Sequence, residues 1–107
     1  MGSRVIPTPR FIREVKPLLK RYASLKDDLL DLENDLIARP DQGSHLGQSI
    51  YKVRLAIKSK GKGKSGGARV ITYLVTEEQE IYLLSIYDKS DLDAVDLKSL
   101  REMIKSL

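Results

Sequence analysis

Seven lysine and arginine residues lie in a central stretch of the sequence that contains no acid. From Gly43 to Thr76 there is no Asp or Glu, so this third of the chain carries a formal charge of +7. The other twelve bases and fifteen acids give −3, and the net charge of +4 hides the asymmetry. A dense group of cations is suited to bind the phosphates of a nucleic acid, because each neutralised phosphate releases counterions. Phosphate binding is therefore the first chemistry to consider.

The cations at the start of this stretch alternate with apolar residues. In YKVRLAIK, residues 51–58, apolar side chains are interleaved with Lys52, Arg54 and Lys58. This period of two predicts a strand with one apolar and one cationic face. Arg69 lies in a comparable position at the start of the next predicted strand, RVITYLV. Regular strands would hold these cations in fixed positions on one face.

A glycine-rich segment, residues 61–67, joins the two predicted strands as a hairpin tip. The tip carries three more bases, Lys60, Lys62 and Lys64. These lysines either contact phosphates or lie in a solvated turn, and the pattern alone allows both interpretations.

The letters GKS at 63–65 suggest a nucleotide-binding P-loop. That motif needs a glycine where Lys58 stands and a helix after the serine, whereas ARVITYLV is typical of a strand. Nucleotide hydrolysis is therefore not expected.

Tyrosines occur in the same predicted strands and offer a second means of binding nucleic acid. Any of Tyr51, Tyr73, Tyr82 and Tyr87 that reach the cationic face could stack on unpaired bases, and the others belong to the core. Cations and tyrosines together indicate a surface for single strands or RNA. His45 precedes the cationic strand in a predicted loop, and we interpret it as a surface residue.

Composition limits the remaining functions. The 107 residues are predicted to form one domain, 1–107, around a single core. No apolar run approaches the roughly 18 residues of a membrane span, and the first residues lack a secretory signal, so we expect a cytoplasmic protein. With no cysteine and one histidine, neither a disulfide nor a zinc site is expected. We expect no metal and no cofactor.

VIPTP, residues 5–9, is predicted to form a short strand or an extended lead, and two helices are predicted between it and the cationic strand. Thr8 supplies an N-cap and Pro9 a first-turn proline for a helix through about Tyr22, which Pro17 should kink or split. A regular leucine spacing predicts the second helix, which ends at Arg39.

The second predicted helix begins with a capping box, Ser24 and Asp27, and carries several more acids. These acids are interpreted as a solvated face. The following residues, PDQGSHLGQS, are predicted to form a loop.

Strands and one helix are predicted after the tip. RVITYLV and EIYLLSIY are apolar on both faces, as expected of central strands joined by the turn TEEQE. Apolar residues from Leu92 to Leu107 predict a final helix, with acids suited to its N-terminal end. The predicted fold class is α+β, with two N-terminal helices, an antiparallel sheet of about four strands whose edge could be mixed, and a C-terminal helix.

The order of elements and several short motifs resemble a known family. YKVRLA, GGARVITYL and IYDKSD, in this order, are similar to the RelE/HigB-type toxins of bacterial toxin-antitoxin modules, within the RelE/ParE superfamily. The resemblance covers nearly the whole chain and implies a RelE-like fold. It also implies a ribosome-dependent mRNA endoribonuclease, independent of metal, which a cognate antitoxin holds inactive.

The same resemblance implies roles for individual residues. Lys52 matches the lysine that handles a proton or stabilises charge, Arg54 a second base on the strand, and Arg69 the arginine that clamps the scissile phosphate. Lys89, in YDKSD, stands where the family often places another base. RNA contacts are expected at the bases of the tip region, Lys58, Lys60, Lys62 and Lys64.

The sequence departs from this family pattern near its C-terminus. Some members use a tyrosine close to the nucleophile, but Val95 or its neighbours occupy that region here. Tyr87 or Asp88 could substitute, so the general base stays open. Two other functions also stay open, a gyrase-inhibiting relative of the ParE type and a nucleic-acid-binding relative without catalysis. The joint presence of Lys52, Arg54 and Arg69 argues against the gyrase inhibitor.

Overall fold

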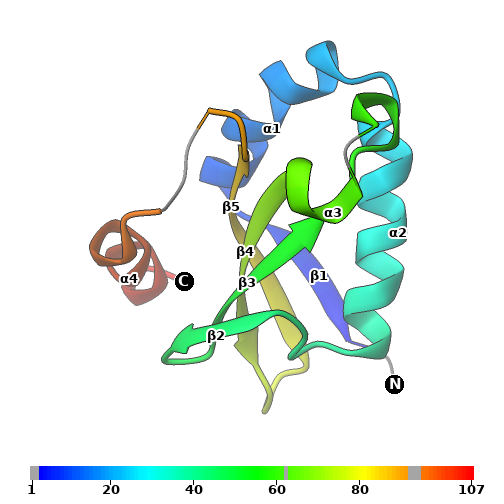
Figure 1. Ribbon diagram of the computed structural model, residues 1–107. Helices are drawn as coiled ribbons and strands as arrows, with labels where there is room; N and C mark the ends of the chain where they lie inside the picture. Colours follow the sequence, from blue (N-terminus) through cyan, green and yellow to red (C-terminus); the bar gives the residue numbers. More distant parts are fainter. Residues whose placement is uncertain (1–2, 62, 92–94) are drawn as a thin grey trace.

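The computed structural model describes residues 3–61, 63–91 and 95–107, without the side chain of Lys64. The fold class is α+β, as predicted. The elements in chain order are β1 (Arg4–Pro7), α1 (Pro9–Arg21), α2 (Leu25–Ala38), β2 (Ser44–Gly47), β3 (Ile50–Leu55), the 3-10 turn η1 (Lys58–Lys60), α3 (Gly63–Gly66), β4 (Ala68–Val75), β5 (Glu80–Asp88) and α4 (Leu97–Lys105) (Figure 1).

The sheet has five strands in the order β1-β5-β4-β3-β2. β5, β4, β3 and β2 pair antiparallel with their neighbours, whereas the edge strand β1 runs parallel to β5. The sheet is therefore mixed, and it has one strand more than the prediction of about four. The additional strand, β2, was predicted as loop, because SHLG is too short to show a period and its turn residues favour a loop.

Local signals explain how α1 begins but not how α2 begins. The Thr8 hydroxyl accepts a hydrogen bond from the Phe11 N–H at 3.3 Å, as an N-cap should. α1 continues through Pro17 as one element, so of the two predicted effects of this proline, a kink or a split, the split is wrong. The predicted capping box of α2 is also wrong, because the Ser24 side chain makes no cap hydrogen bond and donates to Asp28 instead, at 2.7 Å.

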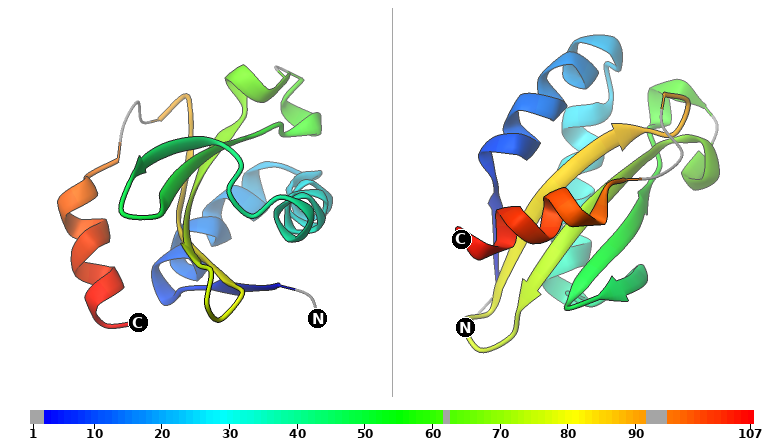
Figure 2. Two further views of the ribbon diagram at one scale, coloured as in Figure 1. Left: turned by 90° about the horizontal axis from the view of Figure 1, so that it is seen from below. Right: turned by 90° about the vertical axis from the view of Figure 1, so that its left-hand side faces the viewer.

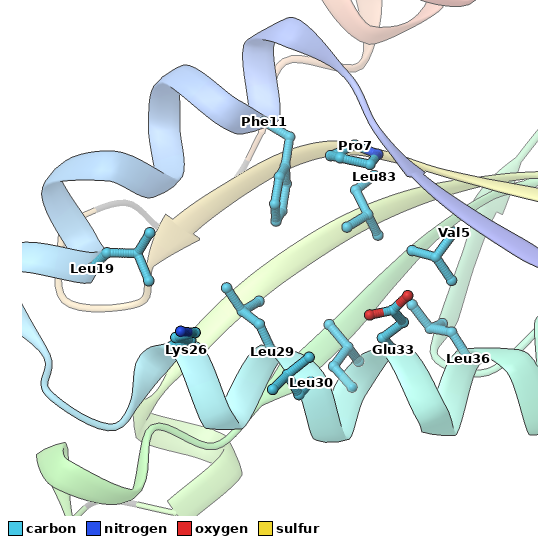
Figure 3. A pocket seen from close by; sticks show the side chains of 11 residues that line it. Val5, Pro7, Phe11, Leu19, Lys26, Leu29, Leu30, Glu33, Leu36 and Leu83 are labelled. Atoms are coloured by element: carbon cyan, nitrogen blue, oxygen red, sulfur yellow. The ribbon is translucent and has the colours of Figure 1, made fainter.

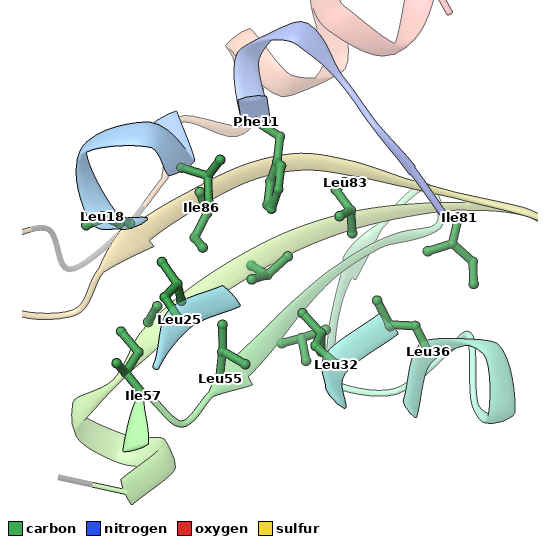
Figure 4. Packing of buried hydrophobic residues seen from close by; sticks show 14 residues of the cluster. Phe11, Leu18, Leu25, Leu32, Leu36, Leu55, Ile57, Ile81, Leu83 and Ile86 are labelled. Atoms are coloured by element: carbon green, nitrogen blue, oxygen red, sulfur yellow. The ribbon is translucent and has the colours of Figure 1, made fainter. Parts of the chain in front are cut away.

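The two faces of the sheet are covered by different helices. α1 and α2 pack on one face and α4 on the other (Figure 2). The larger cluster lies under α1 and α2 and includes Phe11, Leu25, Leu36 and Ile86 (Figure 4). The smaller cluster lies under α4 and joins Leu100 to strand residues including Tyr87. The α4 face is thus covered by a single short helix, which leaves part of the sheet for a binding site.

Two helical turns occur where a plain hairpin turn was predicted, η1 directly before the glycine-rich tip and α3 within it. The tip also touches the sheet closely. A Cβ on Gly67 would lie 2.0 Å from the Leu55 carbonyl oxygen, so only glycine fits there. The Gly67 carbonyl accepts a hydrogen bond from the Lys89 N–H at 3.0 Å, which joins the tip to the end of β5.

The C-terminal helix is shorter than predicted in its described part. α4 begins after Asp96, whose carboxylate accepts a hydrogen bond from the Lys98 N–H at 3.0 Å. The prediction that the helix starts near Leu92 falls on residues outside the described part of the chain. None of the helices that the structure describes is long and apolar enough to cross a membrane.

Candidate catalytic and RNA-binding site

The strand register brings the predicted site residues of three strands into one row. Arg54 of β3 lies opposite Arg69 of β4, and Arg69 lies opposite Tyr87 of β5. Lys52 lies two residues along β3 and therefore on the same face as Arg54. Directly opposed residues have Cβ atoms about 4.5–5.5 Å apart, so these side chains are neighbours. The row lies on the face of the sheet that α4 partly covers.

Lys52 and Arg54 are the accessible members of this row. Arg54 is exposed and Lys52 is half-buried. Among the interactions of the described residues, neither side chain has an ion pair or a hydrogen bond. Both cations are therefore available to an anion from outside the protein.

Arg69 differs from the expectation of an exposed cation, because only 6% of it is accessible. Its guanidinium donates to the carbonyl of Ala68 and to the carbonyl of Ser65 in α3, both at 3.1 Å. The tip thus folds over this arginine.

Tyr87 and Lys89 flank the end of β5. Tyr87 is buried, 7% accessible, in the cluster under α4, and Val95 packs against the same cluster. Lys89 is half-buried, and its backbone is bound to Gly67 of the tip. The structure therefore places Tyr87 beside Arg69 and Lys89 at the junction with the tip.

Asp88, between these two residues, is the centre of a buried polar cluster. Its carboxylate accepts hydrogen bonds from Lys60 Nζ at 2.6 Å, from Arg21 at 3.1 Å and from the Tyr22 hydroxyl. The Ser90 N–H donates to it at 2.9 Å. Sequence patterns did not predict this cluster. The one signal available in the sequence was Asp88 itself, an acid at the end of an apolar strand.

These contacts decide whether Asp88 can act as a general base. Burial alone would raise the pKa of the carboxyl, but the hydrogen bonds from Lys60, Tyr22 and the Ser90 N–H hold the pKa well below its usual range. A carboxylate that is so weakly basic and so fully bound is a poor proton acceptor. The contacts of Asp88 therefore favour a structural role and argue against the suggestion that it substitutes for the missing tyrosine.

The bases of the tip region do not form one exposed group. The Lys60 side chain is only 9% accessible and pairs with Asp88, so of the two interpretations of this lysine the solvated turn is wrong. Lys58 is 72% accessible and lies 3.5 Å from Asp31 of α2. Lys62 and the side chain of Lys64 lie outside the described part of the structure.

His45 lies in β2, not in a loop, although it is exposed as predicted. Its ring lies 4.9 Å from the ring of Tyr51, its partner across the strands. Tyr51 alternates with Lys52, so this pair lies on the face opposite the cation row.

An apolar groove lies on the face of the sheet opposite the cation row, between β1, α1 and α2 (Figure 3). Phe11, Leu29 and Leu83 line it, with Leu19 and Leu30 exposed beside it. It is separate from the cation row. Among the described residues, no three His, Cys, Asp or Glu side chains are arranged to hold a metal ion.

Comparison with known protein families identifies the type of protein. A model of the "RelE toxin of RelE / RelB toxin-antitoxin system" matches residues 4–107. The chain belongs to this family. It is thus a RelE-type toxin of a toxin-antitoxin module, and the family implies an antitoxin as its partner.

The RelE-family chain also resembles a solved structure, the free form of an E. coli RelE toxin in which two arginines are changed to alanine. The TM-score is 0.60 at 14% identity, and the match covers 100% of this chain and 99% of the other. At this identity the likeness shows the RelE-like fold alone. The roles of individual residues must be argued from the site itself.

Proposed function

We propose that this RelE-family toxin is a ribosome-dependent mRNA endoribonuclease that uses the 2′-OH of the RNA as its nucleophile. The observation that carries the proposal is the cross-strand row of Arg54 and Arg69, with Lys52 beside it, in a segment without acids. Fixed cations on a rigid sheet are suited to orient a phosphodiester and to stabilise the charge of its transition state. The partners in this proposal are the ribosome, mRNA and the cognate antitoxin, and the site of action is the cytoplasm.

Each member of the row has a chemical role in this reaction. The 2′-OH attacks the adjacent phosphorus, a bond to the 5′ oxygen breaks, and negative charge builds on the non-bridging oxygens. Arg69 is assigned to those oxygens, because its planar fork can bind two of them at once. Arg54 contacts the same phosphate from the exposed side. Lys52 stabilises charge or handles a proton.

The proton acceptor is the least defined part of the proposal. Tyr87 is the candidate, because it lies opposite Arg69 in the register and the contacts of the Asp88 carboxylate make it a poor proton acceptor. Lys89 lies at the same end of β5 and is assigned to the leaving group or the flanking phosphate. None of these steps needs a metal ion.

Single-turnover cleavage of mRNA on programmed ribosomes, with the cut ends mapped, tests the proposal. Arg69→Ala should lower the cleavage rate by about 10² to 10³, by analogy with the loss of one preorganised donor, and should change ribosome affinity much less. Arg69→Lys should recover only part of the rate, because a point charge does not reproduce the bidentate fork. Circular dichroism of both variants controls for the loss of the Ser65 contact.

Two further arms test the chemistry. A 2′-deoxy nucleotide at the cut should abolish cleavage, because it removes the nucleophile, and EDTA should leave the rate unchanged. Cleavage of the deoxy substrate would show that water is the nucleophile. A folded Arg69→Ala variant that cuts at the normal rate would remove Arg69 from the mechanism. If the wild type cuts no mRNA but inhibits gyrase, the ParE-type alternative replaces the proposal.

A further inference from the structure

A polar concavity lies at the outer edge of β3. Lys52 and Arg54 of the row line it, whereas Arg69 does not. It is lined by Arg39, Asp41, Gln42, Ser44, Lys52 and Arg54. We call it the edge concavity. Arg39 is a third arginine near the row, and no sequence pattern singled it out.

The loop that carries Arg39 is fixed against β3. β2 pairs with β3 only as far as Lys52, and beyond this point the loop from α2 runs along the strand. A Cβ on Gly43 would lie 2.5 Å from the Lys52 carbonyl oxygen, so the loop backbone packs directly on β3. The Arg39 carbonyl accepts hydrogen bonds from the backbone and the side-chain amide of Gln42, at 3.3 and 3.2 Å. The position of Arg39 relative to β3 is therefore set by the fold.

The three cations of the edge concavity have no anionic partner among the described residues. Other bases of the chain do: Glu80, Glu14 and Asp88 each accept from an arginine or lysine. Arg39, Lys52 and Arg54 have neither an ion pair nor a side-chain hydrogen bond there, although Asp41 lies on the same rim. Three like charges around one hollow repel each other, and an anion from outside would relieve this repulsion.

The neighbouring concavity along β3 shows where such an anion is not favoured. It is lined by Arg54 and Lys58 and also by three carboxylates of α2, Asp28, Asp31 and Asp35. This acidic wall disfavours a phosphate. A polyanion that extends from the row past the edge of β3 can therefore run in two directions. Toward Arg39 it meets cations, and toward η1 it meets carboxylates.

We propose that the edge concavity binds a backbone phosphate of the RNA strand, one that flanks the phosphate held at Arg69, with Arg39 as its distinguishing contact. This inference rests on the proposed function for the identity of the RNA. It sets the direction in which the strand crosses β3, from Arg54 toward Arg39 and away from the α2 carboxylates Asp28, Asp31 and Asp35.

The test measures binding of the full chain to a short single-stranded RNA that is 2′-O-methylated throughout and so cannot be cleaved. Fluorescence anisotropy gives Kd over a series of salt concentrations for the wild type, Arg39→Ala and Arg13→Ala. Arg13 is exposed on α1 and makes a matched control with the same change in charge. Arg39→Ala should weaken binding about two- to fivefold at low salt. It should also make the slope of log K against log salt shallower by about 0.7, whereas Arg13→Ala should match the wild type.

Each outcome separates this inference from the proposed function. If Arg39→Ala and Arg13→Ala have the same Kd and slope, or if the wild type binds no RNA, the edge concavity is not a phosphate site, whether or not the toxin cuts mRNA. If Arg39→Ala weakens binding to the antitoxin alone, the concavity is a protein contact and the inference is overturned. If Arg39 contributes as expected but ribosomes show no cleavage, the phosphate site stands and the nuclease proposal fails.

Discussion

The ion pair between Lys60 and Asp88 provides a sharp test, because it decides whether Lys60 is a structural residue or an RNA contact. The two side chains are 9% and 0% accessible, and their charged atoms lie 2.6 Å apart. Lys60 also donates to the Ser90 hydroxyl at 2.8 Å and lies 5.7 Å from the centre of the Tyr22 ring. The ammonium is therefore held between the tip, the end of β5 and the end of α1.

The two single variants should differ in their cost. In Lys60→Met the Asp88 carboxylate keeps Arg21, Tyr22 and the Ser90 N–H as donors, so we expect a loss of about 1.5–3 kcal/mol, the range for one hydrogen bond to a charged group. Asp88→Asn leaves the buried ammonium without its anion, and breaking a buried pair in this way costs about 3–5 kcal/mol. The double variant should be less destabilised than the sum by about 1–3 kcal/mol.

Urea unfolding followed by circular dichroism measures these differences. With a slope of about 1–3 kcal/mol per molar urea, Lys60→Met should lower the midpoint by about 1 M. Lys58→Met is the matched control, because Lys58 is 72% accessible and its pair with Asp31 is at the surface. This control should change the free energy of unfolding by less than about 1 kcal/mol.

RNA binding provides the second readout. Because Lys60 is occupied by Asp88, Lys60→Met should leave the salt slope of RNA binding unchanged. The reasoning is refuted if Lys60→Met is as stable as Lys58→Met and also makes the salt slope shallower. Lys60 would then lie in solution as an RNA-contacting lysine, as the sequence pattern allowed.

Two further predictions concern acid stability and the partner. The pKa of the Asp88 carboxyl is lower in the folded than in the unfolded chain, so its contribution to stability is complete above the unfolded pKa of about 4 and is lost as the pH falls below it. The urea midpoint should therefore fall less steeply between neutral and acid pH for Asp88→Asn than for the wild type. An equal fall for both proteins would contradict the pairing assigned to Asp88. Charge reversal at Lys52 and Arg54 together should weaken antitoxin binding, measured by calorimetry, if an acidic segment covers the row; an unchanged Kd would rule out direct electrostatic masking.

Local patterns predicted the elements that carry their own signals. The Thr8 cap, the alternation of β3 and the apolar strands β4 and β5 were all predicted, because period and capping depend on neighbours in the sequence. The shared face of Lys52 and Arg54 followed from the same alternation, whereas the strand register places Arg69 beside them. The short edge strand β2 was not predicted, because four residues between turn signals show no period.

Contacts between distant residues were beyond these patterns. The tip turns out to pack on the sheet, where Ser65 covers Arg69 and Lys60 reaches Asp88, 28 residues away. Arg39 joins Lys52 only because the loop after α2 runs along β3. Composition shows how many charges a segment has, but not which of them are neutralised in the folded chain.

The acid-free segment therefore has a smaller positive surface than its charge suggests. Carboxylates from other elements neutralise part of it, Asp31 of α2 beside Lys58 and Asp88 of β5 beside Lys60. Among its described side chains, Lys52 and Arg54 stay unpaired, and Arg39 from outside the segment joins them. Among the described side chains, the unpaired positive charge of this region therefore lies at the edge of β3 and not at η1. Since a phosphate is attracted to unpaired cations and not to those already bound to carboxylates, the RNA should follow β3 and bypass η1.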